Sequence, residues 1–411
     1  IDVLWMVRSN GETLQSGTLK DLDLEPQESK KILIPVEKFE MGSFNEYFLD
    51  IEFRLKKKKG VLPKGYLIAW EQLPLINFNT MKLEFDPNIL QDNYSKLNDV
   101  TETNNEIVIT GKDFEILFSK KTATMDSWTF QGKNILLRGP KPNFWRTPTD
   151  NDFGNNMPKR MAVWKHATDE AQVNDIKVDN YDTSVGIEVF YNFPSVESMG
   201  SILYVIYGDG RILVYNKFEI EKGTLPNIPK VGISMQIPKE FDIMTWFGRG
   251  PHENYLDRKS SAKVDIYSGK VSDQNHPYIR PQESGNKTDV RWATFRNVAG
   301  DGLLVRGLLS LNASHYLQED YDHGFGEMKS GATGNIKTTK QQRHSIDMVE
   351  RELINLDIDL IQMGLGGEDS WWAQPLEKYQ IKPKNYDYSF TLMPIKSDEN
   401  PVELNKNAFV K

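Results

Sequence analysis

Apolar side chains recur at every second residue through much of this chain, and that period restricts what the chain can fold into. Leu49, Ile51 and Phe53 share one side of a segment whose intervening residues are charged. The same alternation occurs at residues 114–118 and 185–191. Because successive side chains of a strand point to opposite faces, these segments predict half-buried strands. We therefore predict an all-β protein built of sandwiches.

Turn residues support this prediction. Asp209-Gly210 lies between two apolar runs, and Asn10-Gly11 lies between Val7 and Leu14. Both dipeptides favour the positive φ angles of a tight hairpin. The sequence pattern contains no long amphipathic helix, and its best helical stretch is the short one at residues 159–171.

The length of 411 residues predicts two or three domains. Residues 1–76 have the size of an immunoglobulin domain, and the polar, Asn- and Asp-rich residues 77–105 are interpreted as a linker. The β pattern of residues 106–396 is too long for one simple sandwich of ~100 residues, so we expect a large double-sheet sandwich there. Residues 397–411 are interpreted as a tail.

Composition excludes several classes of function. The net charge of −8 argues against a nucleic-acid-binding surface, and the absence of cysteine rules out disulfides and cysteine-ligated metals. No apolar run approaches the ~20 residues that a membrane helix needs. The chain opens inside a strand-like pattern without Met, so we expect it to continue upstream, with any targeting signal there.

Four loop-like stretches combine aromatic residues with Gly, Asn and Asp. Sugar sites have this chemistry, because aromatic rings stack on the C–H face of a sugar while carboxylates, amides and Arg bind its hydroxyls. The stretches, called the motif segments below, are residues 143–156, 246–258, 278–292 and 363–372.

In the first motif segment, Asp150 and Asp152 have two interpretations. They either serve a site or cap turns, and turn capping is favoured. Gly154 followed by Asn155 and Asn156 predicts a hinge and the polar tip of a mobile loop.

In the second motif segment, His252 is a candidate general base. A buried network of ion pairs and hydrogen bonds that includes Glu253 is the favoured alternative. The third segment has the same polar-turn character. In the last, three glycines precede two Trp, and core packing is slightly favoured for each ring.

The histidines show no zinc-type spacing. Asp320, Asp322 and His323 could hold a hard cation, but carboxylates in polar turns are common, and we expect no metal in this chain.

The four motif segments, taken in order, closely resemble the C-terminal region of the bacterial β-galactosidases of glycoside hydrolase family 2. The resemblance rests on the stretches N-F-W-R-T-P-T-D-N-D-F-G, W-F-G-R-G-P-H-E-N-Y-L-D-R, P-Q-E-S-G-N with D-V-R-W, and M-G-L-G-G-E-D-S-W. The resemblance covers nearly the whole chain. It implies an immunoglobulin-like β-sandwich followed by a large mutarotase-like β-supersandwich.

The resemblance also implies a function. These enzymes hydrolyse terminal β-galactosides with retention, and both catalytic glutamates belong to an upstream (β/α)₈ barrel. We therefore expect no catalytic residue here, and we expect the Mg and the monovalent cation of the family in that barrel. The implied partners are the β-galactoside, the barrel of the same polypeptide and further copies in a homo-oligomer. The compartment, cytoplasmic or periplasmic, stays open.

By the same resemblance, Trp371 packs against the sugar or its aglycone. The loop containing Gly154, Asn155 and Asn156 lies over the pocket. Residues predicted to line the pocket or support its loops are Asp150, Asp152, His252, Glu253 and Asp369.

Two alternatives stay open. A freestanding mutarotase-type epimerase needs a His acid and a Glu base that converge on the sugar, but the adjacent His252 and Glu253 would point to opposite faces of a strand. A purely structural or carbohydrate-binding module predicts that neither Trp371 nor the Gly154 loop borders the barrel.

Overall fold

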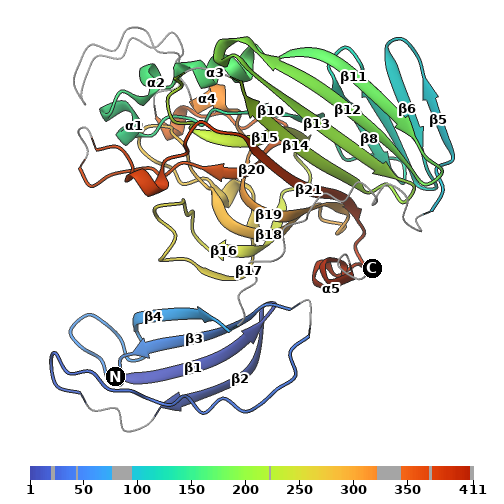
Figure 1. Cartoon of the computed structure of the whole chain (residues 1–411). Helices are drawn as coiled ribbons and strands as arrows, with labels where there is room; N and C mark the ends of the chain where they lie inside the picture. The colour runs from blue at the N-terminus through green and yellow to red at the C-terminus, as the bar shows by residue number, and fades with distance from the viewer. Residues whose placement is uncertain are drawn as a thin grey trace. The chain divides into compact units, whose positions relative to one another are not determined.

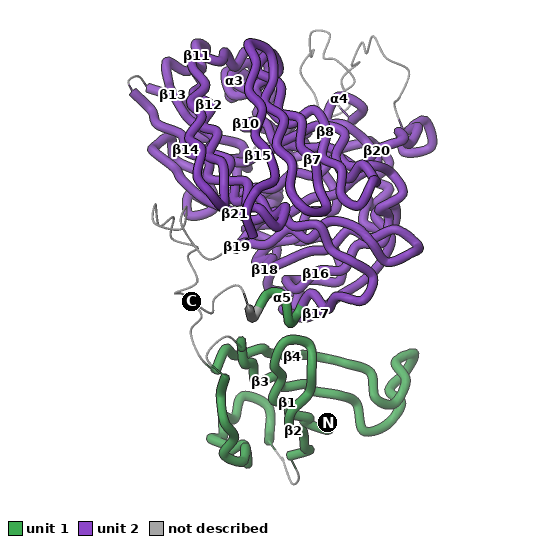
Figure 2. Tube along the Cα trace, turned by 90° about the vertical axis from the view of Figure 1, so that its right-hand side faces the viewer, with its two compact units in different colours: residues 1–82, 402–411 green, residues 83–401 purple. Residues whose placement is uncertain are grey.

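The computed structural model divides the chain into two compact units (Figure 2). Unit 1 comprises Ile1–Lys82 and Val402–Lys411, and unit 2 comprises Leu83–Pro401. The structure describes residues 1–19, 24–42, 45–75, 95–221, 224–321, 344–369 and 373–407.

Unit 1 contains a four-stranded antiparallel sheet in the order β2-β1-β3-β4. Its strands are β1 (Asp2–Ser9), β2 (Glu12–Leu19), β3 (Tyr47–Arg54) and β4 (Leu67–Pro74). Trp5, Val7 and Leu49 form its core, and Ile51 packs against them. The strand predicted at these residues is confirmed as β3, but the alternation in burial is not, because Asp50 and Glu52 are buried while Ile51 and Phe53 are only partly buried. Asn10 and Gly11 have φ angles of 47° and 87° and make the predicted tight turn between β1 and β2.

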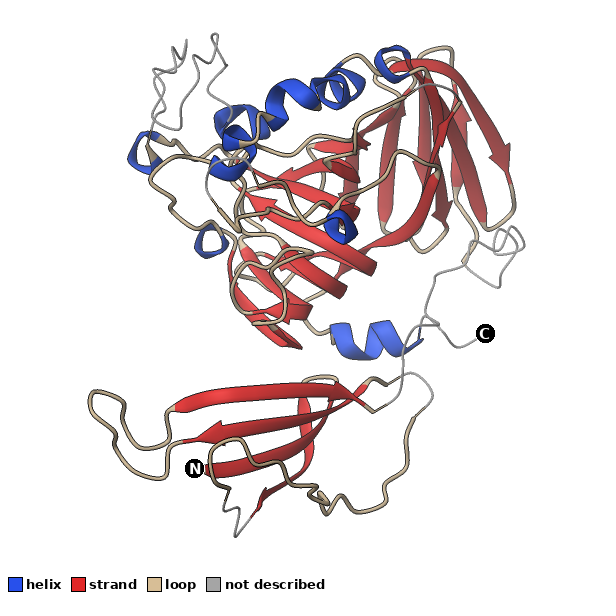
Figure 3. Cartoon of the chain, turned by 60° about the vertical axis from the view of Figure 1, so that its left-hand side comes forward, coloured by secondary structure: helices blue, strands red, loops and turns tan. Residues whose placement is uncertain are grey.

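Unit 2 is built from a curled twelve-stranded antiparallel sheet and a separate five-stranded sheet (Figures 1 and 3). The five-stranded sheet has the order β5-β6-β7-β8-β9. Its strands are β5 (Asp99–Glu102), β6 (Glu106–Thr110), β7 (Phe114–Ser119), β8 (Thr124–Phe130) and β9 (Lys133–Asn134).

The large sheet runs β10-β15-β20-β19-β21-β14-β13-β12-β11, and β16, β17 and β18 branch from it at β19. Its strands are β10 (Arg138–Asn143), β11 (Gln172–Asn180), β12 (Ser184–Phe193), β13 (Ser198–Tyr207), β14 (Ile212–Ile220), β15 (Lys230–Pro238), β16 (Ile243–Gly250), β17 (Lys263–Lys270), β18 (Lys287–Arg296), β19 (Gly302–Ser314), β20 (Leu353–Gln362) and β21 (Tyr386–Ile395). The mostly-β fold, a smaller β unit followed by a large curled sheet, agrees with the sequence prediction.

The two sheets of unit 2 share one apolar core. Side chains of β7, such as Ile116 and Phe118, belong to the same buried cluster as Ile187 of β12 and Tyr204 of β13. The rings of Phe118 and Tyr204 lie 5.6 Å apart between centroids. Burial of both inner faces holds the sandwich closed.

Helices are short and gather mainly on one side of unit 2 (Figure 3). They are α1 (Asp150–Gly154), α2 (Met157–Arg160), α3 (Ala162–Asp169) and α4 (Gln318–Tyr321), with single 3-10 turns at Pro194–Val196, Ser272–Gln274, Ser345–Asp347 and Glu377–Tyr379. A further helix, α5 (Pro401–Asn407), starts at the last residue of unit 2 and otherwise belongs to unit 1. Trp164 of α3 is fully buried and donates its indole N–H to the carbonyl of Pro226 at 3.1 Å. In the described residues, no helix is long and apolar enough to cross a membrane.

Three segments differ from the sequence expectation. The stretch 159–171, expected as one helix, holds the end of α2 and then α3, with Met161 outside helical geometry at φ −114° and ψ 11°. Strand β5 lies within the expected linker, where Val100 and Thr101 pair with β6. Residues 401–407 of the expected tail are helical. Each differing segment is short or polar, so periodicity carries little information there.

Candidate functional site

The first motif segment is anchored by Arg146, whose side chain is completely buried. Its guanidinium donates to both carboxylate oxygens of Asp152, at 2.9 and 3.0 Å. Asp152 accepts the backbone N–H of Thr149, and the Thr149 hydroxyl accepts the N–H of Asp152. This reciprocal pair is a capping box at the start of α1.

Asp150 connects the first motif segment to the third. Its N–H donates to the side-chain oxygen of Gln282 at 3.0 Å, and the Gln282 amide donates back to its carboxylate at 2.9 Å. The Arg280 guanidinium lies 3.6 Å from the same carboxylate and 3.8 Å from the centre of the Phe153 ring. Because the Asp150 side chain stays largely exposed, this contact lies at the surface of the cluster.

The glycine-rich last segment is held by residues of the first two. Arg146 donates to the carbonyls of residues 363 and 364, at 2.6 and 3.1 Å. Asp257, from the second segment, accepts the N–H groups of Leu365 and Gly366 at 3.0 and 2.8 Å. Side chains distant in sequence thus satisfy the main chain of a segment that forms no helix or strand.

Glu253 connects the second segment to the third. Its carboxylate accepts hydrogen bonds from the Tyr278 hydroxyl, from Arg258 at 2.5 Å and from the Gly285 N–H at 2.9 Å. Burial alone would raise the pKa of Glu253, but these donors bring that pKa below its ordinary value. The carboxylate therefore stays ionised and works as a connector between two loops.

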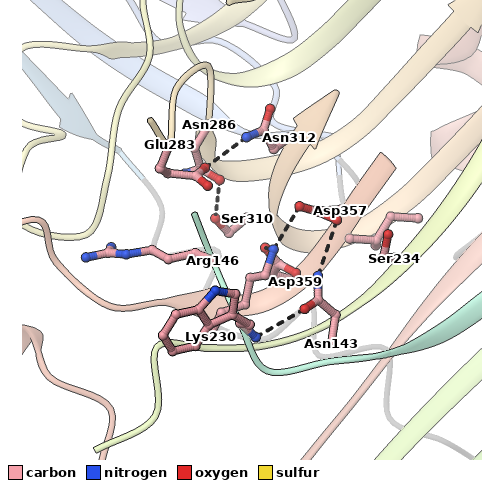
Figure 4. A network of polar contacts seen from close by, with 12 residues as sticks. Asn143, Arg146, Lys230, Ser234, Glu283, Asn286, Ser310, Asn312, Asp357 and Asp359 are labelled. Atoms are coloured by element: carbon pink, nitrogen blue, oxygen red, sulfur yellow. Dashed lines mark hydrogen bonds and ion pairs between the residues drawn. The ribbon is translucent and has the colours of Figure 1, made fainter. Parts of the chain in front are cut away.

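Beneath the motif segments lies a buried polar layer on strands of the large sheet (Figure 4). Lys230 of β15 is 1% exposed, and its ammonium lies 2.8 Å from Asp357 and 3.6 Å from Asp359 of β20. Asn143 and Asn355 also donate to Asp357, at 3.4 and 3.2 Å. Burial would lower the pKa of Lys230, but the carboxylates around it raise that pKa above its ordinary value.

Two acids of this layer hold their protons more tightly than usual. Burial raises the pKa of Asp359 well above its ordinary value. A Cβ on Gly232 would lie 1.8 Å from an Asp359 oxygen, so this carboxyl requires glycine on the neighbouring strand. Burial likewise raises the pKa of Glu283, which accepts the Asn312 amide at 2.9 Å and faces the opposing charge of Lys230.

The polar tip predicted at residues 154–156 is a junction of two short helices. Gly154 ends α1, and the side chain of Asn155 is buried, where it donates to the Asn151 carbonyl at 2.9 Å and accepts from Arg160 at 2.6 Å. Asn156 is exposed with a left-handed φ of 59°. The expected hinge is thus a hydrogen-bonded turn, and the part that these residues take in ligand binding stays a prediction.

His252 is exposed, and its ring lies 3.0 Å from the Ser261 hydroxyl. Partial burial lowers its pKa, and the charges of Lys287 and Arg258 add to the effect. Glu253 next to it faces Tyr278 and Arg258, so the two side chains have different partners. This arrangement does not supply the convergent acid and base that the epimerase alternative needs.

Trp371 lies outside the described residues, as do Ser370 and Trp372. Asp369, just before them, is exposed and accepts the Ala373 N–H at 3.1 Å. Its predicted place beside the pocket stays a prediction.

Asp320, one of three residues considered for a cation, instead pairs with Arg351, at 2.6 and 2.7 Å. Asp322 and His323 lie outside the described residues. Among residues that the structure does describe, no group of three or more His, Cys, Asp or Glu is arranged to hold a metal ion.

Sequence reasoning missed Asp357 and Asp359, the acids of the buried polar layer next to the motif segments. Asp357 and Asp359 lie two residues apart in the largely apolar strand L-I-N-L-D-I-D-L-I-Q, and this was the available signal. Two acids on one face of a buried strand need a cation, which Lys230 provides.

Two protein-family models match the chain. The model described as beta galactosidase small chain matches residues 110–392, and the model described as beta-galactosidase, domain 4, matches residues 1–76. The first covers more than half of the chain.

Curated beta-galactosidases are similar over nearly all of this chain. The protein from Priestia megaterium is 31% identical over 401 residues, which is 96% of this chain and 36% of that protein. The protein from Pseudoalteromonas haloplanktis is 27% identical over 95% of this chain and 36% of its own length. The chain thus spans about a third of the length of these relatives.

Among solved structures, a GalM/aldose epimerase homologue from C. elegans has a TM-score of 0.40 at 9% identity, covering 73% of this chain and 100% of its own. Galactose 1-epimerase from Lactobacillus acidophilus has a TM-score of 0.38 at 8% identity, covering 73% and 99%. Both values are low and describe a distant similarity. The family-model matches and the identity to the Priestia megaterium protein show that the chain belongs to the beta-galactosidase family.

Proposed function

We propose that this chain is the C-terminal, non-catalytic part of a retaining β-galactosidase and supplies one wall of its active site. The observation that carries the proposal is that the first two motif segments hold residues 363–366 of the last one, through Arg146 and Asp257. Trp371 follows in the same motif segment of the sequence. A rigidly held segment is what an aromatic contact to a sugar requires, because the ring must be ordered before it can bind well.

The state of the carboxylates supports a non-catalytic role. Retaining hydrolysis needs an acid/base carboxyl and a nucleophile about 5–5.5 Å apart. Three of the carboxylates in the motif segments, those of Asp152, Glu253 and Asp257, each accept two or more hydrogen bonds from side chains or backbone amides of these segments. In the proposal the reacting pair belongs to an upstream barrel, and so do the residues that bind Mg²⁺ and a monovalent cation.

The proposed substrate is a terminal β-galactoside. Its proposed partners are the barrel of the same polypeptide and further copies of the complete enzyme. The chain would add to the pocket an aromatic ring at Trp371 and the turn that contains Asn155 and Asn156.

The test is turnover of a chromogenic β-galactoside by two proteins, the 411-residue chain and the complete polypeptide encoded by its gene. We expect activity only in the complete polypeptide. Activity in the 411-residue chain would contradict the non-catalytic assignment. Inactivity of a folded complete polypeptide on galactosides, with turnover of another β-glycoside, would contradict the proposed substrate.

A further inference from the structure

We propose that a lysine-rich hairpin of unit 1 binds acidic polysaccharide through the sulfate or carboxylate groups of the polymer. The hairpin comprises residues 55–66, between β3 and β4, and is called the lysine hairpin below. The choice of a polysaccharide among other polyanions rests on the proposed function, because a galactosidase acts on sugars. The inference goes beyond that function by assigning a second, non-catalytic sugar-binding surface outside the motif segments.

Positive charge is concentrated in the lysine hairpin. All of its lysine side chains are exposed, and they are Lys56, Lys57, Lys58, Lys59 and Lys64. They lie in a chain whose net charge is −8, so the rest of the chain is still more acidic. Because salt screens charges over about 8–10 Å, a polyanion near the hairpin is attracted by the local excess of lysine.

The backbone of the lysine hairpin is ordered by cross-strand hydrogen bonds. Near its base, the Leu55 N–H donates to the Tyr66 carbonyl at 3.0 Å. At its tip, Lys59 and Leu62 exchange two hydrogen bonds of 3.0 Å around Gly60, whose φ of 58° suits a tight turn. The lysines are thus presented on an ordered scaffold, which lowers the entropy cost of binding.

The ammonium groups of the lysine hairpin are not neutralised by the protein. In the described part of the chain, no carboxylate forms an ion pair with any of them. The neighbouring Arg54, by contrast, lies 2.6 Å from the carboxylate of Glu52. A run of lysines at a strand end is commonly only a solvated surface. This hairpin differs because Lys64 follows the turn, so that both arms carry positive charge.

An aromatic residue lies on the same hairpin. Tyr66 is 45% exposed and pairs with Leu55, next to the start of the lysine run. Aromatic rings stack on the C–H face of a sugar, and ammonium groups bind sulfate or carboxylate, so the hairpin has both groups that an acidic sugar needs. A bilayer is disfavoured, because a flat anionic surface also faces the acidic remainder of the chain, whereas a linear polymer touches only the hairpin.

Binding is measured by isothermal titration calorimetry on the 411-residue chain, so that the result does not depend on hydrolysis. The probes are carrageenan for sulfate groups, polygalacturonate for carboxylates and a neutral galactan. We expect an acidic polymer to bind at least about tenfold more tightly than the neutral one, and its affinity to fall at least about tenfold between about 50 and 200 mM salt, because the contacts release counterions. The tighter acidic polymer identifies the acidic group.

The double substitution Lys57→Glu with Lys58→Glu tests the lysine hairpin. It replaces two attractions by two repulsions on exposed side chains, so we expect binding at least about tenfold weaker and an unchanged urea midpoint. The matched control is Lys112→Glu with Lys121→Glu, at exposed positions of unit 2, which should weaken binding less than about twofold because salt screens distant charges. Tyr66→Ala should weaken binding, whereas Tyr66→Phe should not, because Phe retains the stacking face.

Four outcomes would contradict a proposal. Absence of binding to both acidic polymers, or equal affinities of the two double variants, would overturn the hairpin site. Equal or tighter binding of duplex DNA, or of phosphatidylglycerol vesicles that Val61 enters with its 94% exposed side chain at the turn, would overturn the choice of polysaccharide. Binding of an acidic polymer at the hairpin, together with inactivity of the complete polypeptide on galactosides, would overturn the proposed function and leave the hairpin site intact.

Discussion

At the scale of single residues, unit 2 buries two lysines in different electrostatic surroundings. Lys230 faces Asp357 and Asp359, and these carboxylates outweigh burial to raise its pKa. Lys287 donates to the Gly285 carbonyl at 2.9 Å and lies 5.2 Å from the centre of the Trp246 ring. Burial lowers the pKa of Lys287 to about 8, although the charge of Glu253 opposes this shift. The charged form of lysine is therefore favoured at position 230 by the neighbouring carboxylates, whereas at position 287 it is disfavoured by burial.

The substitution Lys230→Met should lower the free energy of unfolding by about 3–5 kcal/mol, because it leaves buried carboxyls without their cation. Urea denaturation measures this loss. The matched control is Lys217→Met, which breaks an exposed ion pair with Glu219 and should cost no more than ~1 kcal/mol. Equal losses in the two variants would show that the Lys230 cluster does not need its charge.

Trp371→Ala should mainly weaken substrate binding in the complete enzyme. Loss of one aromatic contact is worth roughly 1–3 kcal/mol. The measurement is KM and kcat for several galactosides. A substitution such as Trp164→Phe is not a suitable control, because the Trp164 ring is fully buried. Phe at position 371 is the better control, since it retains an aromatic face and should restore most of the binding.

At the scale of elements, α1 shows where the sequence was informative and where it was not. Turn capping was the favoured interpretation of Asp152, and its carboxylate does accept the Thr149 N–H. The expected loop is nevertheless a one-turn helix, because Thr149 and Asp152 have the spacing of a capping box. Five residues are too few for an apolar period to reveal a helix.

Strands and hairpins could be predicted for a local reason. Side-chain alternation and the dipeptides Asn10-Gly11 and Asp209-Gly210 act within a few residues. The order of the large sheet could not be predicted, because its neighbours are distant along the chain. Lys230 and Asp357 touch across 127 positions, and Arg146 reaches Gly364 across 218.

The capping box gives a prediction at this scale. Thr149→Ala should lower the free energy of unfolding by about 1 kcal/mol, the usual cost of losing a cap, whereas Thr149→Ser keeps the hydroxyl and should be nearly neutral. Chemical denaturation of both variants checks this. A similar loss in both would point to the Thr149 methyl group rather than to the hydrogen bond.

At the scale of the whole molecule, the apolar core and the buried polar contacts hold different parts of unit 2 together. The core joins the two sheets of unit 2, while the buried layer of Lys230, Asp357 and Asp359 joins strands within one sheet. The loops above it are connected to one another by Arg146 and Glu253. Because these contacts are ionic, the stability of unit 2 should depend on pH.

For Lys287, both the direction of this pH dependence and the pH range in which it occurs can be derived. Its pKa is about 8 in the folded protein and ~10.4 in an unfolded chain. Between these values the unfolded chain binds the extra proton, so the contribution of Lys287 to the free energy of unfolding rises with pH across this window and is constant on either side of it. The full increment is roughly 3 kcal/mol, at ~1.4 kcal/mol for each pK unit.

The test compares the native chain with Lys287→Met by urea denaturation from pH 7 to pH 10.5. Met fills similar space without the charge, so the variant lacks the increment, while all other titrating groups change both proteins alike. We expect the variant to gain most relative to the native chain at pH 7 and to lose that advantage as pH approaches 10.5. A difference that does not vary with pH would mean that Lys287 keeps its proton in the fold, and that the Trp246 ring and the Gly285 carbonyl together solvate the ammonium as well as water does.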